Sequence, residues 1–177
     1  MAIMTLTNQL KYIAHSRWYW LIYIIGSISL IAIALYFQYA RDELPCVMCI
    51  QIRLWFSLLI IVSFIGLLAR RIWAINTLVQ VSIVLIAVGL VERSYKLLGT
   101  ERGFWDGHCG FDLGLPAWFA IDKWLPWLFR VETTCSYTPE ILFGITMAET
   151  LMVMSVVLLL VSLCVLLLYM VSPLSKR

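Results

Sequence analysis

Two cysteines and an arginine at the start of a long apolar segment are the residues of this sequence best suited to chemistry. Cys46 and Cys49 form a Cys-x-x-Cys motif directly after Pro45, and Arg53 follows four residues after Cys49. If the apolar segment is a helix, Cys49 lies in its first turn and Arg53 one turn further on the same face. A helix N-terminus and a guanidinium both stabilise a thiolate. The pattern therefore predicts a reactive sulfur at Cys49.

The motif alone fits either thiol redox chemistry or a metal site. Zinc needs four converging ligands, and Cys109 and Cys135 would complete such a set with the motif. Structural zinc sites usually take their ligands as two close pairs, whereas these two cysteines are widely separated, and Arg53 would repel a cation. Sulfurs on separate arms suit a thiol–disulfide relay, in which they exchange partners. We expect a redox relay and no metal.

The elements that must hold these sulfurs are membrane spans. The chain has 177 residues, of which 63% are hydrophobic and 13% are charged. A soluble domain this small cannot bury so much apolar side chain, so the bilayer is the expected solvent. We therefore predict an all-α integral membrane protein, a four-helix transmembrane bundle that forms one domain over residues 1–177. The four stretches long enough to cross are about residues 18–39, 50–69, 72–91 and 151–171.

Basic residues near the spans predict the orientation, because positive charge gathers on the cytoplasmic side. Those without an acidic neighbour are Lys11, Arg17, Arg70, Arg71, Lys176 and Arg177. Both chain ends are then cytoplasmic, and the loops at about residues 40–49 and 92–150 lie outside. An arginine at the depth of Arg53 must face the bundle interior or a ligand, unless it snorkels to the headgroups. Cys164, inside the fourth span, is expected to be a small apolar residue facing lipid or a helix.

The long outer segment has three parts. Residues 99–114 are rich in glycine and charge and predict a mobile loop that carries Cys109. The neighbouring His108 either tunes that cysteine or is an ordinary polar loop residue. Residues 115–129, with three tryptophans, predict a helix lying in the membrane interface, although a packed cap over the bundle would use the same residues. Residues 141–149 predict a short amphipathic segment that leads into the fourth span.

These features together resemble the DsbB family of bacterial inner-membrane disulfide-forming proteins. The matching residues are Pro45–Cys49 with Arg53, then Cys109, then Asp122–Pro126, then Cys135. Four spans with both cysteine pairs on one side complete the resemblance, which covers nearly the whole chain. The combination is far more specific than any single motif in it.

The resemblance implies a quinone-dependent, disulfide-forming protein-dithiol oxidoreductase in the bacterial inner membrane. A periplasmic thioredoxin-fold protein of the DsbA type attacks Cys109 of a Cys109–Cys135 disulfide. The Cys46–Cys49 pair then reoxidises the loop through Cys46 and Cys135. Cys49 passes the electrons to a membrane quinone, either ubiquinone or menaquinone, and Arg53 polarises a quinone oxygen. Cys49 and Arg53 are thus the expected quinone-binding residues, and the partners are the dithiol protein, the quinone pool and membrane lipid.

Two positions depart from the family pattern. Ile52 stands where members commonly have glutamine or glutamate before the arginine, and Gln51 lies one position earlier. Lys96 stands where a histidine is often found near the quinone. These departures leave the quinone type open.

Two other interpretations stay open beside this one. A vitamin K epoxide reductase-like enzyme also couples a Cys-x-x-Cys motif to a quinone, but there the motif lies near the last span, whereas here it opens the second. A non-enzymatic tetraspan would use two disulfides only to staple its outer loops. Such disulfides would resist mild reductant, and added quinone would change nothing.

Overall fold

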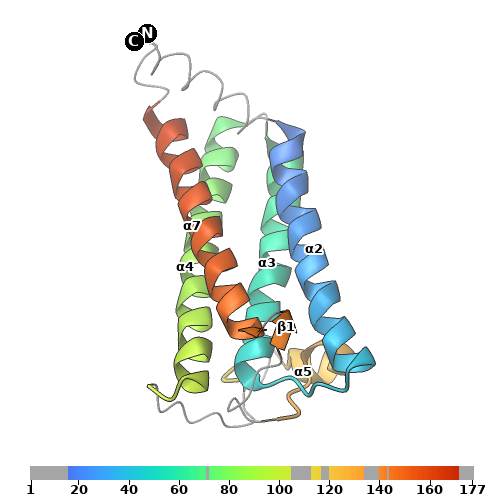
Figure 1. Ribbon diagram of the computed structural model, residues 1–177. Helices are drawn as coiled ribbons and strands as arrows, with labels where there is room; N and C mark the ends of the chain where they lie inside the picture. Colours follow the sequence, from blue (N-terminus) through green and yellow to red (C-terminus); the bar gives the residue numbers. More distant parts are fainter. Residues whose placement is uncertain are drawn as a thin grey trace.

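Four long helices form an antiparallel bundle in the computed structural model of the protein (Figure 1). The structure describes residues 16–70, 72–104, 113–116, 120–133, 140–142 and 144–171. Every long helix is apolar enough over a sufficient length to cross a bilayer. The chain is therefore a multi-pass membrane protein, and the predicted four-helix fold class is confirmed. The long helices are α2 (Arg17–Ala40), α3 (Val47–Ala69), α4 (Trp73–Glu101) and α7 (Met147–Val171).

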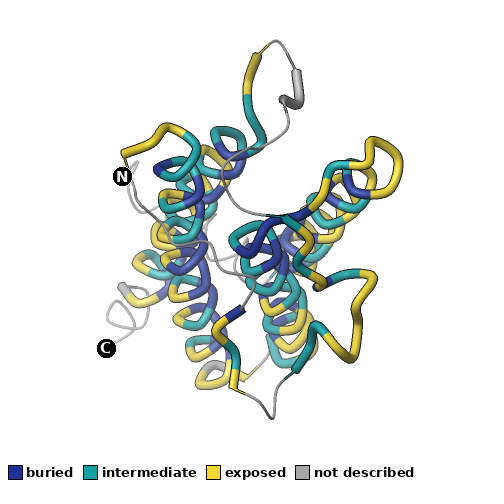
Figure 2. The backbone as a smooth tube through the Cα atoms, turned by 90° about the horizontal axis from the view of Figure 1, so that it is seen from below, coloured by how far each residue is buried: buried dark blue, intermediate teal, exposed yellow. Residues whose placement is uncertain are grey.

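The helices pack in the order α2, α3, α4, α7, each against the next. Short connections between α2 and α3 and between α3 and α4 leave these neighbours no arrangement except antiparallel. The buried residues lie where the helices face one another (Figure 2). Many of the exposed side chains are large and apolar. An apolar outer surface is expected of a bundle whose solvent is the apolar core of a bilayer. The start of α2 and the end of α7 lie at one end of the bundle, called here the inner end, and the Cys-x-x-Cys motif lies at the other, the outer end (Figure 1).

Helix α4 extends further than the sequence predicts. The third span was expected to end near Val91, but the helix continues to Glu101. The added turns are stabilised by a 2.5 Å ion pair between Glu92 and Lys96, one turn apart. They also pack against α7, where the hydroxyls of Ser94 and Ser155 lie 3.0 Å apart. Gly103, with a φ of 74°, ends the helix because a left-handed conformation suits glycine.

Residues 115–129 do not form the single interfacial helix that their composition predicts. The described part contains two short helices, α5 (Ile121–Trp124) and α6 (Pro126–Phe129), separated at Leu125. Leu125 has φ −132° and ψ 64° because a residue before proline is pushed out of the helical region. Trp124 and Trp127 remain exposed, so the segment still presents the aromatic surface expected of a membrane interface.

The segment before α7 is a β-hairpin and not a continuous amphipathic piece. Strands β1 (Glu140–Leu142) and β2 (Ile145–Thr146) pair antiparallel, with Gly144 in the turn at a φ of 79°. Helix α7 then starts with a capping box. The Thr146 hydroxyl accepts from the Glu149 amide at 3.3 Å, and the Glu149 carboxylate accepts from the Thr146 amide at 3.2 Å. Glu149 also pairs with Arg102, which joins the outer ends of α7 and α4.

The inner half of the bundle is held by a close approach of α2 to α3. Trp20 on α2 is fully buried, and its ring lies over Gly66 on α3. Helices in lipid associate through such close packing and through interhelical hydrogen bonds. One of these bonds joins α2 to α4, where the Tyr19 hydroxyl donates to Gln80 Oε1 at 3.1 Å. Packing at Gly66 therefore fixes the α2–α3 distance on which the outer end depends.

Replacing Gly66 with alanine should destabilise the protein by about 1–3 kcal/mol or more, because the new Cβ would overlap the Trp20 ring. The measurement is thermal unfolding in detergent micelles. Gly26→Ala is the matched control, since nothing lies within 4 Å of a Cβ at that helical glycine. It should leave stability unchanged or raise it by about 0.5–1 kcal/mol through helix propensity. Equal stability of the two variants would contradict this account of the α2–α3 packing.

Candidate functional site

The two cysteines of the motif lie together at the outer end of α3. Cys46 is the N-cap residue, and its Sγ accepts a hydrogen bond from the Cys49 amide at 3.4 Å. Its own backbone is extended, with φ −84° and ψ 168°, and the helix begins at Val47. The two Sγ atoms are 3.0 Å apart. Cys46 is buried at 1% exposure, whereas Cys49 is half-buried. The sulfurs thus sit at the positive end of the helix dipole, as the sequence predicts.

Arg53 lies one turn below Cys49 and is 5% exposed. Its Nη1 donates to Gln38 Oε1 at 2.7 Å and to the Leu128 carbonyl at 3.1 Å, and its Nη2 donates to the Ala34 carbonyl at 3.2 Å. These acceptors come from α2 and α6, so the guanidinium joins three helices. An arginine held in this way is not snorkelling to the headgroups, and the interior-facing alternative is the one observed.

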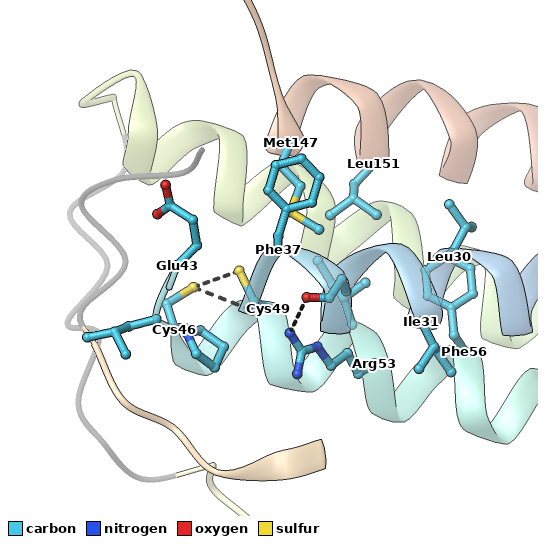
Figure 3. Close-up of a pocket in the computed structure, with 14 residues that line it drawn as sticks. Leu30, Ile31, Phe37, Glu43, Cys46, Cys49, Arg53, Phe56, Met147 and Leu151 are labelled. Carbon is cyan, nitrogen blue, oxygen red and sulfur yellow. Dashed lines mark hydrogen bonds between the residues drawn. The ribbon is translucent and has the colours of Figure 1, made fainter. Parts of the chain in front are cut away.

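An apolar pocket between α2, α3 and α7 brings Cys46, Cys49 and Arg53 to one surface (Figure 3). Within the described part of the chain, the buried Arg53 Nε has no hydrogen-bond partner. A buried donor of this kind is costly unless a ligand or water supplies an acceptor. The residue with this unpartnered donor and the two cysteines therefore line one apolar pocket. Its apolar lining includes Leu30, Ile31, Phe37, Ile52, Phe56, Met147 and Leu151.

The free volume of this pocket, about 50 Å³, is small. A cavity of roughly 150 Å³ is needed to hold a benzene ring. A ring-shaped ligand would therefore have to displace side chains, and Phe37 and Met147 are lining side chains near Cys49 (Figure 3). Met147 is suited to this because its unbranched side chain repacks at little cost.

A second apolar groove adjoins the pocket on its lipid side. It lies between α2 and α7, has a volume of about 210 Å³, and shares Leu30 and Phe56 with the pocket. Residues of its walls, such as Ile22 and Val157, are exposed toward lipid. The groove and the pocket therefore meet at these two shared side chains.

The outer segment is attached to the motif through its backbone. The Pro45 carbonyl accepts from the amides of Glu132 and Thr133, at 3.0 and 3.3 Å. Thr133 also forms a parallel bridge with Cys46. Because Thr133 precedes Cys135 by two positions, the chain that carries Cys135 starts from a point beside Cys46.

Cys109, Cys135 and His108 lie outside the described residues. Cys164 is exposed on α7, which suits the expected lipid-facing position. Lys96 is paired with Glu92.

Sequence reasoning missed the residues that hold Arg53. Gln38 is the only one of its three partners that uses a side chain. A single buried amide in an otherwise apolar span was the available signal. The Ala34 and Leu128 carbonyls carry no side-chain signal at all.

Comparison with known proteins gives one consistent match. Residues 16–165 match the family model described as Disulfide bond formation protein DsbB. Disulfide bond formation protein B of Shewanella frigidimarina is 30% identical over 148 residues, which cover 82% of this chain and 86% of that protein. Disulfide bond formation protein B 2 of Pseudomonas aeruginosa is 30% identical over 137 residues, which cover 75% of this chain and 80% of that protein. The corresponding protein of Haemophilus influenzae is 29% identical over 152 residues, with 81% and 82% covered.

The Gln38→Leu substitution tests the anchoring of the guanidinium. It should lower the free energy of unfolding in detergent by about 1.5–3 kcal/mol, because a buried charge loses a hydrogen-bond acceptor. Ser82→Ala is the control, since that hydroxyl donates to the Leu78 carbonyl of its own helix. If both variants unfold like the unsubstituted protein, Gln38 does not stabilise the site.

Proposed function

This chain belongs to the DsbB family of disulfide bond formation proteins, and from that membership we propose that it is a quinone-dependent thiol oxidase. It would reoxidise a periplasmic dithiol protein of the DsbA type and pass the electrons to a membrane quinone. The observation that carries the proposal is the meeting of Cys46, Cys49 and Arg53 at one apolar pocket. The proposed location is the bacterial inner membrane, with both termini cytoplasmic and the outer end periplasmic.

The first half of the proposed reaction is disulfide exchange with the partner. A partner thiolate attacks Cys109 Sγ, so that the Cys109–Cys135 bond breaks and a mixed disulfide forms. The second thiolate of the partner then attacks the partner's own sulfur in this mixed disulfide. The partner leaves with an internal disulfide, and Cys109 is released as a thiolate. Two loop thiols remain, and two electrons have entered this chain.

The second half moves these electrons to the motif. The Cys135 thiolate attacks Cys46 of a Cys46–Cys49 disulfide and releases the Cys49 thiolate. Cys109 then attacks Cys135, which restores the loop disulfide and releases Cys46. The attachment of Thr133 to Cys46 and Pro45 supports this route, because it starts the arm of Cys135 next to its proposed target. The released Cys49 thiolate lies at the helix N-terminus, one turn from the Arg53 guanidinium.

The lining of the pocket suits a quinone in its chemistry, although the ring would enter only after side chains such as Phe37 and Met147 repack. A quinone supplies an acceptor for two electrons and two protons, and it presents carbonyl oxygens on an apolar ring. The Arg53 Nε–H is a buried donor with no described acceptor, so it would hold one such oxygen. Cys49 lines the same pocket, and the groove between α2 and α7 would take an apolar tail. A disulfide that only staples loops would need neither the donor nor the groove.

Trapping experiments test the order of the sulfurs. Cys135→Ala, incubated with the oxidised partner, should accumulate a mixed disulfide between Cys109 and the partner, because the resolving thiol is missing. Non-reducing electrophoresis and peptide mass spectrometry identify the linkage. Cys164→Ala is the control and should accumulate none. An adduct that instead forms at Cys135 in a Cys109→Ala variant would reverse the assignment.

Quinone kinetics test Arg53. Arg53→Lys keeps the positive charge but loses the planar fork. It should raise the apparent quinone KM, but by less than the factor that corresponds to the loss of a whole charged hydrogen bond, about 1.5–3 kcal/mol. Thiol exchange with the partner should stay near the unsubstituted rate. Quinone reduction is followed optically with purified protein, reduced partner and defined quinones. Arg41→Gln, which changes an exposed arginine at the outer end, is the matched control. Unchanged quinone kinetics in the Arg53 variant would remove its proposed role.

A further inference from the structure

A larger pocket lies on the opposite side of α3 from the sulfurs. It is enclosed by α3, α4 and the segment that starts at Leu113, and its volume is about 390 Å³. Arg93 stands at its polar end, and apolar side chains of α3 form one wall. We propose that this pocket binds a glycerophospholipid of the outer leaflet. Arg93 would hold the phosphodiester, and one acyl chain would lie along α3.

The charge of Arg93 is the first argument. Its Nη1 donates at 3.0 Å to Gln51 Oε1, which is a neutral acceptor. The acidic neighbour Glu92 is engaged by Lys96 at 2.5 Å. Across the described ranges, no carboxylate lies within ion-pair distance of Arg93. A half-buried cation at the membrane surface that has no anionic partner among the described residues favours a bound lipid phosphate.

The way Arg93 is held is the second argument. Gln51 accepts from Arg93 and, through Nε2, donates to the Leu113 carbonyl at 3.1 Å. The guanidinium is thus fixed at the pocket by a side chain that is itself attached to the backbone. A guanidinium presents several N–H donors in a planar fork, and this geometry matches phosphate oxygens. A pre-positioned fork loses less conformational entropy on binding than a mobile one.

The shape of the apolar wall is the third argument. Gln51, Leu54, Leu58 and Ile61 recur at helical spacing, so they form one strip down α3. From Gln51 to Ile61 the helical rise is about 15 Å. This is about half of the hydrocarbon thickness of a bilayer, which is the depth of one leaflet. Leu58 and Ile61 are 42% and 57% exposed, so the strip is open for a chain to enter from the lipid side.

Native mass spectrometry of the delipidated full-length protein in detergent tests the site. Titration with dioleoyl phosphatidylglycerol should give a first binding event that Arg93→Gln weakens about tenfold or more. The affinity of Arg93→Lys should lie between that of the unsubstituted protein and that of Arg93→Gln, because the charge remains without the fork. Arg41→Gln is the matched control for loss of a positive charge at the outer end and should bind like the unsubstituted protein. Equal weakening in the Arg41 and Arg93 variants would overturn the proposal.

Two further measurements separate a lipid site from a simple anion site. Inorganic phosphate should fail to displace the bound lipid at concentrations where dioleoyl phosphatidylglycerol competes. Ile61→Trp, which fills the lower part of the strip and leaves Arg93 in place, should weaken binding of the long-chain lipid. Displacement by inorganic phosphate would show that Arg93 binds only an anion, and unchanged affinity in Ile61→Trp would show that no acyl chain lies along α3. The Ile61 variant also tests the site if Arg93→Gln fails to fold.

Discussion

The outer end of this protein depends on the burial of one charge. The Arg53 guanidinium is almost fully enclosed at a depth where water is scarce, and an ion there is stable only when its N–H groups are bonded. Two acceptors come from α2 and one from α6. Satisfying the arginine therefore places α2 beside α3 and brings the short helix of the outer segment down onto the bundle. The apolar pocket is enclosed by the same arrangement.

Hydrogen bonds also hold the start of α3 and the outer segment together. Cys46 has the extended backbone of an N-cap residue, and this turns the Pro45 carbonyl toward the amides of Glu132 and Thr133. A sulfur is a weak acceptor for the helix amide compared with the hydroxyl or carboxylate that usually caps a helix. The cap is therefore weaker than a serine would make it, and the choice of cysteine costs stability at this end. Such a cost is expected where a residue is kept for its chemistry.

Features that depend on residues close together in the sequence could be predicted from it, whereas features that depend on contacts between distant residues could not. The spans follow from hydropathy, and the shared face of Cys49 and Arg53 follows from the helical period. The break at Leu125 was readable from Pro126, and the start of α7 from the Thr146–Glu149 capping box, so both were available as local signals.

The partners of Arg53 were not available in that way. Two are backbone carbonyls, which every residue possesses, and the third is the amide of Gln38, whose sequence neighbours do not tell which helix it faces. Their selection depends on which helices become neighbours, and no local pattern in the sequence encodes that. The extension of α4 has both a local and a distant origin, because Glu92 and Lys96 pair within the helix and Ser94 bonds to Ser155, far along the chain.

A cation lies on each of two sides of helix α3: Arg53 is buried, and Arg93 is half-buried. Arg53, on the side of α2 and α7, donates to three acceptors of the protein, and its buried Nε has no partner among the described residues. Arg93 approaches the other side from α4 and has one neutral acceptor, Gln51. The first cation is thus held by acceptors of the protein itself, whereas the second has one described acceptor and would use its other donors for an anion. Because the two pockets open on different faces of one helix, a lipid at Arg93 would not block access to Cys49.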